Sequence, residues 1–301
     1  MRSFPYTYYT NGFYIASELS FPELEDATGT PTAFISYGQV PEKLENPTFE
    51  SPYQQANQEE YLLDVKNAAR YWLKNNNEII VQPYENVQID DVRVYVLSIL
   101  MGVLLHKHNL LPIHSCCIKV NEAAVLIAGD SGAGKSTISL GLYRKGYEIL
   151  NDDISTVFLN EEKTPFVHPG YKHLKLWSES LEKYGYAATD YRKLRSEIEK
   201  YSFPINRSST LAALPVKAVI ILNPNADKEL SFEPISGVKA FDTLNKNTFG
   251  RNLLKILGKE ASHFKLCSAV ATKVKVIKVN RPEGTKPAEF ADYMEELIKT
   301  I

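Results

Sequence analysis

A glycine-rich segment at residues 129–137 carries the residue types that bind phosphate groups. It reads GDSGAGKST and fits the pattern G-x-x-x-x-G-K-[ST], with a short apolar run before it and an amphipathic stretch after it. Glycines let the backbone come close to phosphate oxygens without a Cβ clash, and the N–H groups at a helix N-terminus attract anions. The segment therefore predicts a site for a nucleoside triphosphate, and a chance glycine-rich turn is the alternative.

Each residue of this loop has an expected part in binding. The side chain of Lys135 should reach the β- and γ-phosphates, and the hydroxyl of Ser136 should be a Mg²⁺ ligand. Backbone N–H groups along the loop should point at phosphate oxygens. The residues expected to bind the nucleotide are Gly129, Ser131, Gly132, Ala133, Gly134, Lys135, Ser136 and Thr137.

A pair of carboxylates follows the loop closely in the sequence. Asp152 and Asp153 end a predicted strand, Tyr147–Leu150, that begins directly after the predicted P-loop helix. A helix followed by a returning strand can bring these carboxylates back beside the phosphates. Phosphoryl transfer needs one carboxylate on the metal and, in a kinase, another that accepts the proton of the acceptor hydroxyl. Two adjacent aspartates could divide these roles, although a strand points neighbours to opposite faces and a polar turn is the alternative.

The elements before this unit predict a small β-rich module over residues 1–89. Asn11-Gly12 is typical of a hairpin turn between alternating aromatic residues. Residues 41–60 are polar and contain proline, so we expect a loop there. The remaining strands are expected at Thr32–Tyr37, Tyr61–Val65, Ala69–Leu73 and Glu78–Gln82. The edge strands of such a module could capture an extended peptide, or the module could serve packing and oligomerisation.

Residues 90–301 are expected to form the second unit, which begins with a buried helix. This helix starts at Asp90 or Asp91 and runs to about His108, and it is apolar on nearly every face. Strands are expected at His114–Val120, Ala123–Ala128, Val157–Leu159, Ala218–Leu222 and Val274–Val279, and helices at Thr137–Lys145, Ser178–Tyr184, Lys239–Gly258 (interrupted) and Ala288–Thr300. The predicted fold class is α+β, a small β-rich module followed by a P-loop kinase core with a mixed sheet and flanking helices.

Composition narrows the class of partner. The 301 residues are 44% hydrophobic and carry a net charge of -2, which gives no global signature of nucleic-acid binding. The longest apolar run, Val94–Leu105, is shorter than the roughly 20 residues that a membrane span needs. Three cysteines are too few for a disulfide framework, and the N-terminus has no secretory signal. We therefore expect a soluble, cytoplasmic protein without nucleic-acid or membrane partners.

Three blocks of the sequence resemble the catalytic domain of the HPr kinase/phosphorylase family, within the wider phosphoenolpyruvate-carboxykinase-like group. They read LPIHSCCI, GDSGAGKST and GYEILNDDI, and weaker similarity continues in VHPGYKHLKLW, EKY and LNKNTFGRNLL. The resemblance implies ATP and Mg²⁺ as cofactors and a homo-oligomer as the assembly. It also implies the site residues: Asp152 as catalytic base, Asp153 as metal-linked carboxylate, His114 as the residue that orients the pair, and Lys200 and Arg251 as phosphate or substrate contacts.

The sequence departs from that family in two places. A Glu-Leu-Arg-Gly-rich signature is absent downstream of the aspartate pair, and the first 89 residues differ from the family's regulatory domain. The layout is more similar to stand-alone kinases that phosphorylate the C-terminal serine of lasso-peptide precursors. We therefore expect a Mg²⁺-dependent kinase that transfers the γ-phosphate of ATP to a serine of a peptide or small protein. The alternatives are a kinase of HPr or of a small metabolite, and a nucleotide-binding ATPase switch without phosphotransfer.

Overall fold

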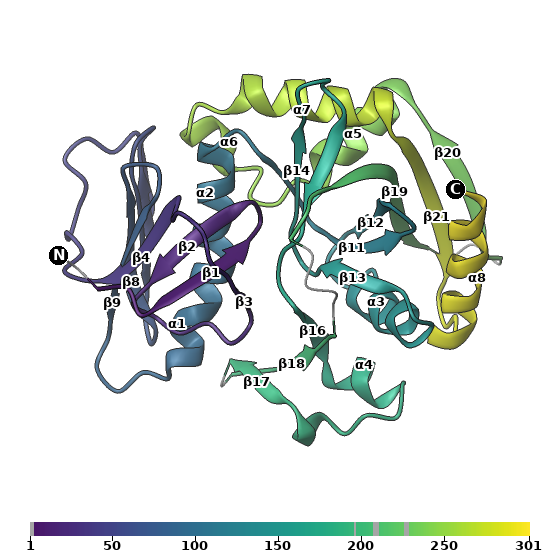
Figure 1. Ribbon diagram of the computed structural model, residues 1–301, viewed down its shortest axis with the longest axis horizontal. Helices are drawn as coiled ribbons and strands as arrows, with labels where there is room; N and C mark the ends of the chain where they lie inside the picture. Colours follow the sequence, from purple (N-terminus) through teal and green to yellow (C-terminus); the bar gives the residue numbers. More distant parts are fainter. Residues whose placement is uncertain (1–2, 196, 207–210, 226–228) are drawn as a thin grey trace.

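The computed structural model describes residues 3–195, 197–206, 211–225 and 229–301. A β-rich N-terminal unit, the front module, leads through a helical segment into a larger core of strands and helices. A small third sheet lies beside both (Figure 1). The expected α+β class, with a β-rich N-terminal module and a mixed sheet flanked by helices, is confirmed.

The strands of the front module form a single twisted sheet. Its strands are β1 (Tyr6–Thr10), β2 (Phe13–Ser17), β3 (Glu25–Asp26), β4 (Ala33–Tyr37), β5 (Phe49–Glu50), β6 (Gln54–Ala56), β7 (Tyr61–Val65), β8 (Ala69–Lys74) and β9 (Glu78–Pro83), in the order β3-β1-β2-β4-β9-β8-β7-β6-β5. The turn predicted at Asn11-Gly12 joins β1 to β2, and both residues have positive φ, as a tight hairpin of this type requires.

The segment predicted as a loop at residues 41–60 contains the short strands β5 and β6. Strand β5 pairs with β6, and β6 pairs with β7, so the two strands extend the edge of the front sheet. Pairing uses backbone groups, which polar side chains do not prevent, and the amide oxygen of Gln55 also accepts the backbone N–H of Leu44 at 2.8 Å. Because side-chain pattern was the signal for strands, these two were not predicted.

The predicted buried helix is present but is interrupted. It consists of α1 (Ile89–Tyr95), a π-helical turn η1 (Val96–Leu100) and α2 (Met101–Lys107). Its apolar side chains share one hydrophobic core with the front sheet, for example Leu100 and Leu104 with Tyr71 and Leu73. The helix is therefore packed into the front module as well as joined to the core.

The core sheet is mixed. Its strands are β10 (Leu111–Ile113), β11 (Ser115–Val120), β12 (Ala123–Gly129), β13 (Glu148–Asn151), β14 (Ser155–Leu159), β15 (Pro165–His168), β19 (Leu214–Asn225), β20 (Ser231–Ile235) and β21 (Lys275–Pro282). The central strands β12, β19 and β21 are parallel to one another. Strand β11 pairs antiparallel with β12, and β13 pairs antiparallel with β11, so β13 runs in the same direction as β12. The carboxyl ends of β12 and β21 therefore lie at the same edge.

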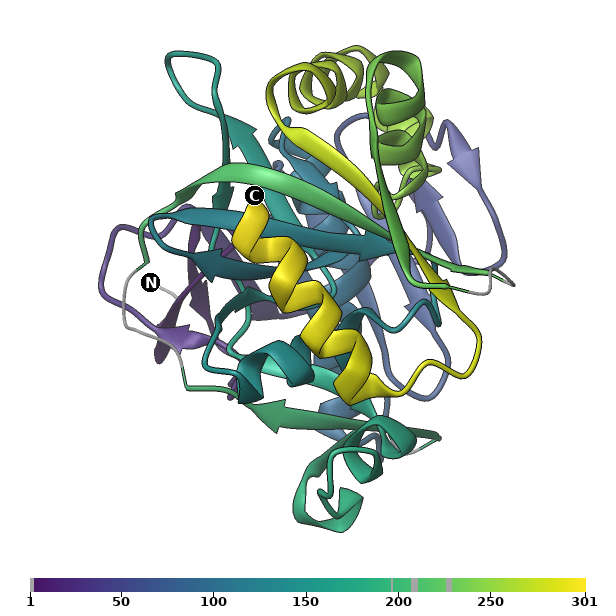
Figure 2. The same ribbon diagram turned by 90° about the vertical axis from the view of Figure 1, so that its right-hand side faces the viewer.

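Helices cover both faces of the core sheet. On one face lie α3 (Lys135–Arg144) and α8 (Pro287–Thr300), and Figure 2 shows α8 running across the strands. On the other face lie α5 (Gly237–Lys246) and α7 (Glu260–Lys273), whereas the short α6 (Leu253–Ile256) packs Leu253 into the core shared with the front sheet. Strand residues alternate between the two cores, since Cys116 packs under α3 and α8 and Cys117 under α5 and α7. Both thiols are free and buried, as expected for reduced strand residues.

A small third sheet links the two parts. It consists of β16 (His173–Trp177), β17 (Arg192–Arg195) and β18 (Ile198–Pro204), in the order β16-β18-β17, and β16 leads into α4 (Ser178–Glu182) and then the short 3-10 helix η2 (Ala188–Asp190). Strand β16 packs against α3 of the core. At the other edge, Arg192 forms ion pairs with Glu23 of the front module and with Asp90 of α1. The third sheet therefore touches both the P-loop helix and the front module.

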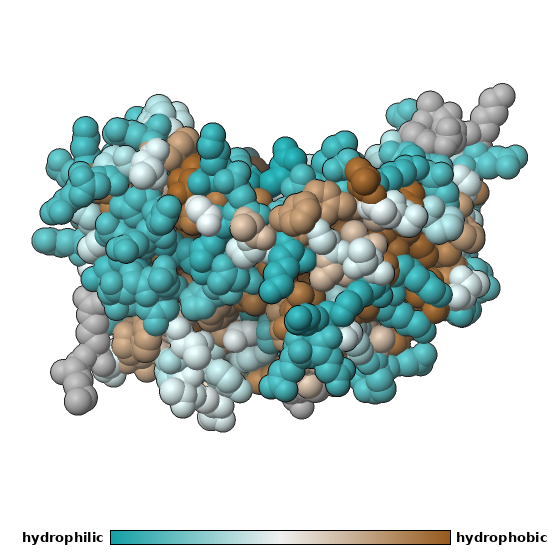
Figure 3. All heavy atoms as spheres, turned by 90° about the horizontal axis from the view of Figure 1, so that it is seen from above, coloured by the Kyte–Doolittle hydropathy of each residue, from teal (hydrophilic) through white to brown (hydrophobic). Residues whose placement is uncertain are grey.

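Among the described residues, the helices are too short or too polar to cross a bilayer. On the face that Figure 3 shows, hydrophobic side chains form small patches among hydrophilic ones. Patches of this kind are ordinary on globular surfaces.

Candidate active site

Strand β12 and helix α3 flank the glycine-rich loop, as the predicted P-loop requires. Gly129, Gly132 and Gly134 have φ values of 149°, 84° and 95°, a region that favours glycine. A Cβ on Gly129 would lie 2.8 Å from the carbonyl oxygen of Leu222 on the neighbouring strand, so this position also needs the absence of a side chain. Helix α3 begins at Lys135, which places its unpaired N-terminal N–H groups at the loop.

Lys135 lies over this loop. Its Nζ donates to the carbonyl oxygens of Gly129 at 2.7 Å and Asp130 at 3.0 Å. Burial lowers the pKa of Lys135, and the acidic groups nearby oppose that effect. The ammonium group is thus held at the start of α3, where the expected phosphates of a nucleotide would lie.

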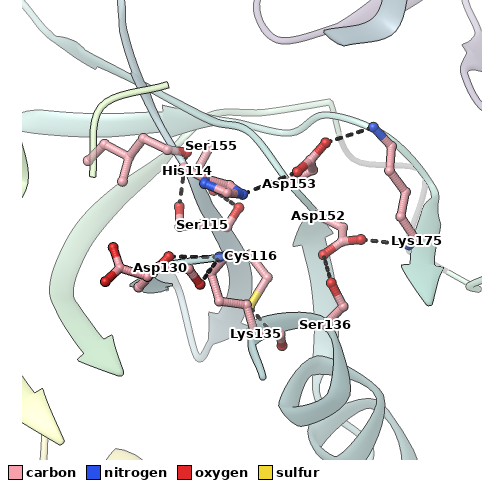
Figure 4. A network of polar contacts seen from close by, with 12 residues as sticks. His114, Ser115, Cys116, Asp130, Lys135, Ser136, Asp152, Asp153, Ser155 and Lys175 are labelled. Atoms are coloured by element: carbon pink, nitrogen blue, oxygen red, sulfur yellow. Dashed lines mark hydrogen bonds and ion pairs between the residues drawn. The ribbon is translucent and has the colours of Figure 1, made fainter. Parts of the chain in front are cut away.

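Asp152 points at the P-loop helix and is almost completely buried, with 1% of its surface exposed. Its Oδ1 accepts a hydrogen bond from the hydroxyl of Ser136 at 3.2 Å, and its Oδ2 accepts from the backbone N–H of Lys175 at 2.6 Å (Figure 4). Burial, together with the negative charge of Asp153, raises the pKa of Asp152. Both oxygens of this carboxylate are therefore occupied by groups of the protein.

Asp153 points in a different direction. Its backbone is left-handed, with φ 76°, and its carboxylate lies between His114 and Lys175 (Figure 4). Oδ1 is 3.4 Å from His114 Nε2, and Oδ2 is 2.8 Å from Lys175 Nζ. Burial alone would raise the pKa of Asp153, but the Lys175 ammonium and the His114 hydrogen bond hold it well below its usual range. This carboxylate is therefore ionised at neutral pH.

His114 reaches Asp153 because the strand predicted over His114–Val120 breaks at this residue. His114 lies at a bend between β10, which pairs with β14, and β11, which pairs with β12 and β13. Its backbone N–H donates to the carbonyl of Asn247 at 2.8 Å, and its ring lies edge-on to Phe249. The bend and these contacts fix the imidazole at the cavity rather than in the sheet.

The loop and the aspartate pair border a cavity of 1320 Å³. Asp153 lines this cavity and Asp152 does not. Lys200 also lines it, with its Nζ 5.6 Å from the centre of the Trp177 ring. Arg251 lies outside it, exposed on the segment after Phe249. The residues expected at the site that line the cavity are His114, Ser131, Gly132, Gly134, Lys135, Ser136, Thr137, Asp153 and Lys200.

Two cations of the site were not predicted. Lys175, from β16, contacts both aspartates, and its sequence block was noted only as a weak resemblance. Arg281, at the end of β21, approaches the loop so closely that its Nη1 would be 3.2 Å from a Cβ on Gly134. Its Nε is buried and has no hydrogen-bond partner among the described residues. The strand Val274–Val279 was predicted, but not that its parallel register would deliver Arg281 to the P-loop edge.

The oxygen atoms at the loop fit a magnesium ion. Mg²⁺ prefers hydroxyl and carboxylate oxygens and commonly takes one or two carboxylates together with phosphate oxygens. Ser136 and Asp152 offer such oxygens at the start of α3. Among the described residues no cluster of three or more His, Cys, Asp or Glu side chains could hold a metal unaided. The donors present therefore suit a metal that the nucleotide helps to hold.

Comparison with known proteins finds similarity in short segments. No protein-family model matches the chain. An HPr kinase/phosphorylase of Limosilactobacillus reuteri is 38% identical over 52 residues, which are 17% of this chain and 16% of that protein. An HPr kinase/phosphorylase of Lactobacillus acidophilus is 37% identical over 73 residues, 23% of this chain and 22% of that protein. The matches thus span less than a quarter of either relative, and the chain is HPr kinase/phosphorylase-like over these segments.

A solved structure, that of the Hpr(Ser) kinase/phosphatase from Coxiella burnetii, aligns with 63% of this chain and 97% of that one. The TM-score is 0.33 and the sequence identity 11%, a likeness too distant to bear on function.

Proposed function

We propose that this protein is an ATP- and Mg²⁺-dependent kinase that transfers the γ-phosphate to a serine hydroxyl of a peptide or small protein. One observation carries the proposal: two adjacent carboxylates beside a P-loop face different partners. Asp152 bonds to the Ser136 hydroxyl, whereas Asp153 lines the cavity between His114 and Lys175. A kinase needs one carboxylate on the metal side and one on the acceptor side.

The loop binds the triphosphate through its N–H groups, and Lys135 exchanges its carbonyl partners for phosphate oxygens. Ser136 and Asp152 would hold Mg²⁺, which neutralises charge on the β- and γ-phosphates when it is bound. The ionised Asp153 accepts the proton of the acceptor hydroxyl, and His114 and Lys175 keep its carboxylate in place. A carboxylate of low pKa suffices for this role, because in the loose transition state of phosphoryl transfer catalysis is mainly positioning and charge stabilisation.

This division of roles reverses the one that the sequence resemblance implied. There Asp152 was expected as the base and Asp153 as the metal-linked residue. The burial of Asp152, and the occupation of both its oxygens, favour the metal side for that residue. The exposed fraction of the Asp153 side chain, 21%, favours the acceptor side for the other.

The lining of the cavity supports a peptide or small-protein acceptor. The cavity of 1320 Å³ includes the P-loop residues, so it has room for the nucleotide and for part of an acceptor beside it. Trp177, 51% exposed, offers an apolar surface at its rim. We propose Lys200 as an acceptor-side contact and Arg281 as a phosphate contact. Arg251 lies outside the cavity and could meet only the far end of a long acceptor.

The acceptor itself has two candidates. A peptide ending in serine, as in lasso-peptide precursors, is our first proposal, because the departures from HPr kinase/phosphorylases lie downstream of the aspartates and in the front module. HPr is the second, which the similarity of short segments favours. We further propose a cytoplasmic homo-oligomer in which residues 1–89 form the front module and residues 90–301 the catalytic unit.

A phosphotransfer assay read by mass spectrometry tests this proposal. The protein is incubated with ATP and Mg²⁺ and, separately, with a peptide ending in serine, with HPr and with free serine. A gain of one phosphate on the peptide, absent in the Lys135→Ala variant, is the expected result. A gain of one phosphate on HPr alone, or on free serine alone, would identify that molecule as the acceptor instead. Hydrolysis of ATP without any transfer would support an ATPase switch instead.

A further inference from the structure

The helix that joins the front module to the core has an irregular hydrogen-bond pattern at its centre. In a regular α-helix the backbone N–H of Met101 would donate to the carbonyl of Leu97. Here, at the end of the π-helical turn η1, it donates to the carbonyls of Val96 and Ser98 instead. Turns of this kind are rare and are frequent at functional sites. The Leu97 carbonyl is thus open to a partner from another element.

That partner is Tyr171, which lies between β15 and β16. Its hydroxyl donates to the Leu97 carbonyl oxygen at 2.5 Å, and the side chain is buried. The ring of Tyr171 also lies against the side chain of Lys175, with Nζ 5.4 Å from the ring centre. A cation at this distance from an aromatic face is attracted to it, more strongly where water is excluded.

Lys175 in turn contacts both members of the aspartate pair. Its Nζ is 2.8 Å from Asp153 Oδ2, and its backbone N–H donates to Asp152 Oδ2 at 2.6 Å. A continuous set of contacts therefore runs from the π-helical turn through Tyr171 and Lys175 to the carboxylate that lines the cavity.

We infer that Tyr171 is a positioning residue for phosphotransfer, with its hydroxyl anchored on the π-helical turn and its ring directing Lys175 toward Asp153. This inference rests on the proposed kinase function. Because the helix shares its hydrophobic core with the front sheet, the front module takes part in setting the geometry of the site.

The chain offers a matched control. Tyr71 is also buried, and its hydroxyl donates to the carbonyl of Val92 on the same helical segment at 2.9 Å. Tyr71 belongs to β8, and none of its described contacts is with Lys175 or the aspartates. Tyr71→Phe and Tyr171→Phe each remove a single buried hydroxyl from a bond to a helix carbonyl, but only the second should disturb the site.

The test compares unfolding in urea and steady-state phosphotransfer for wild type and both variants. We expect similar small losses of stability and an unchanged KM for ATP. We also expect a kcat about tenfold lower in Tyr171→Phe alone, as a modest misplacement of a reacting group produces. A Tyr171→Phe variant with the kcat of Tyr71→Phe would overturn the inference, whereas a wild type that transfers no phosphate would overturn the proposed function.

A double-mutant cycle asks whether Tyr171 acts through Lys175. In a Lys175→Met background, Tyr171→Phe should lower kcat no further, because the group that it positions is gone. Lys175→Arg keeps the positive charge and should restore the sensitivity to Tyr171→Phe. Independent, multiplicative effects in the Lys175→Met background would contradict the positioning role.

Discussion

The hydroxyl of Ser136 donates a hydrogen bond to Oδ1 of Asp152 across 3.2 Å. The two residues come from the first turn of α3 and from the end of β13, so the bond closes the unit that the sequence predicted from a helix and a returning strand. The bond also engages the carboxylate of Asp152, the residue that the sequence resemblance implied as the catalytic base. This bond is one reason why we propose Asp152 for the metal side and Asp153 for the acceptor side.

Asp152→Asn keeps the shape of the side chain and removes its charge from the metal side. We expect transfer to require about 10- to 100-fold more Mg²⁺, as loss of a group that hydrogen-bonds to a metal ligand, here the Ser136 hydroxyl, commonly causes. Rates measured against Mg²⁺ concentration at saturating ATP check this expectation. A fall in rate that saturating Mg²⁺ does not relieve would return the role of base to Asp152.

Asp153→Asn removes the cavity carboxylate that we propose as the proton acceptor. Transfer at saturating Mg²⁺ should fall at least about 100-fold, since general bases contribute at least that much. Binding of Mg²⁺-ATP should stay near the wild-type level. Calorimetric binding and single-turnover transfer, measured on the same preparation, separate the two effects. Transfer at the normal rate would exclude Asp153 as the base.

Lys135→Ala should weaken nucleotide binding and nearly abolish transfer, because the ammonium group at the loop is lost. Lys145→Ala is the control, since Lys145 follows the same helix and pairs with Asp292 and Glu295 on the far side from the loop. Binding of ATP, measured by calorimetry, should be weaker in the first variant and unchanged in the second. Equal binding in both would remove Lys135 from the site.

Sequence reasoning found the parts of the site that are local in the chain. Loop, helix, returning strand and aspartate pair form one continuous segment, and the pattern of residues specifies each of them. It did not find Lys175 or Arg281, because contacts between strands depend on register and sheet order, which periodicity does not encode. The different directions of the two aspartates were also hidden, since they depend on the left-handed backbone of Asp153.

The same limit applies to the fold. The turn at Asn11-Gly12 and the long apolar helix were predictable from residue types, whereas the π-helical turn was not. Helix α7 was missed although His263, Leu266, Cys267 and Val270 follow helical spacing, so its signal was present in the sequence.

The tip of the first hairpin should contribute more to stability than an ordinary turn. Asn11 is completely buried with φ 53°, and its Oδ1 accepts from the Thr156 hydroxyl at 2.8 Å. Asn11→Ala leaves that hydroxyl without its partner, at a cost of about 1–3 kcal/mol. Asn67→Ala, in the exposed turn between β7 and β8 with φ 67°, carries a similar backbone cost without the loss of a buried hydrogen bond. Urea unfolding of both variants should show this difference, and equal losses would contradict it.

Acid should destabilise the protein partly through His106. Burial lowers the pKa of His106 to about 4, below its ordinary value of 6.5, so the folded state binds fewer protons than the unfolded state between these values. Its contribution to stability is complete above about pH 6.5 and is lost as the pH falls toward 4. Between pH 7 and pH 5, wild type should lose about 2 kcal/mol more than His106→Gln. If urea unfolding shows that wild type and His106→Gln lose the same stability between pH 7 and pH 5, the prediction is wrong.

The most direct test of the central claim follows the γ-phosphate itself. ATP labelled with ¹⁸O in the γ-phosphate is incubated with the protein, Mg²⁺ and a peptide ending in serine, and the products are read by mass spectrometry. The account predicts the heavy phosphate on the serine of the peptide, with little labelled inorganic phosphate, and at least about 100-fold slower transfer by Asp153→Asn. Labelled inorganic phosphate formed in the presence of the peptide, of HPr and of free serine, with none of the three modified, would contradict it.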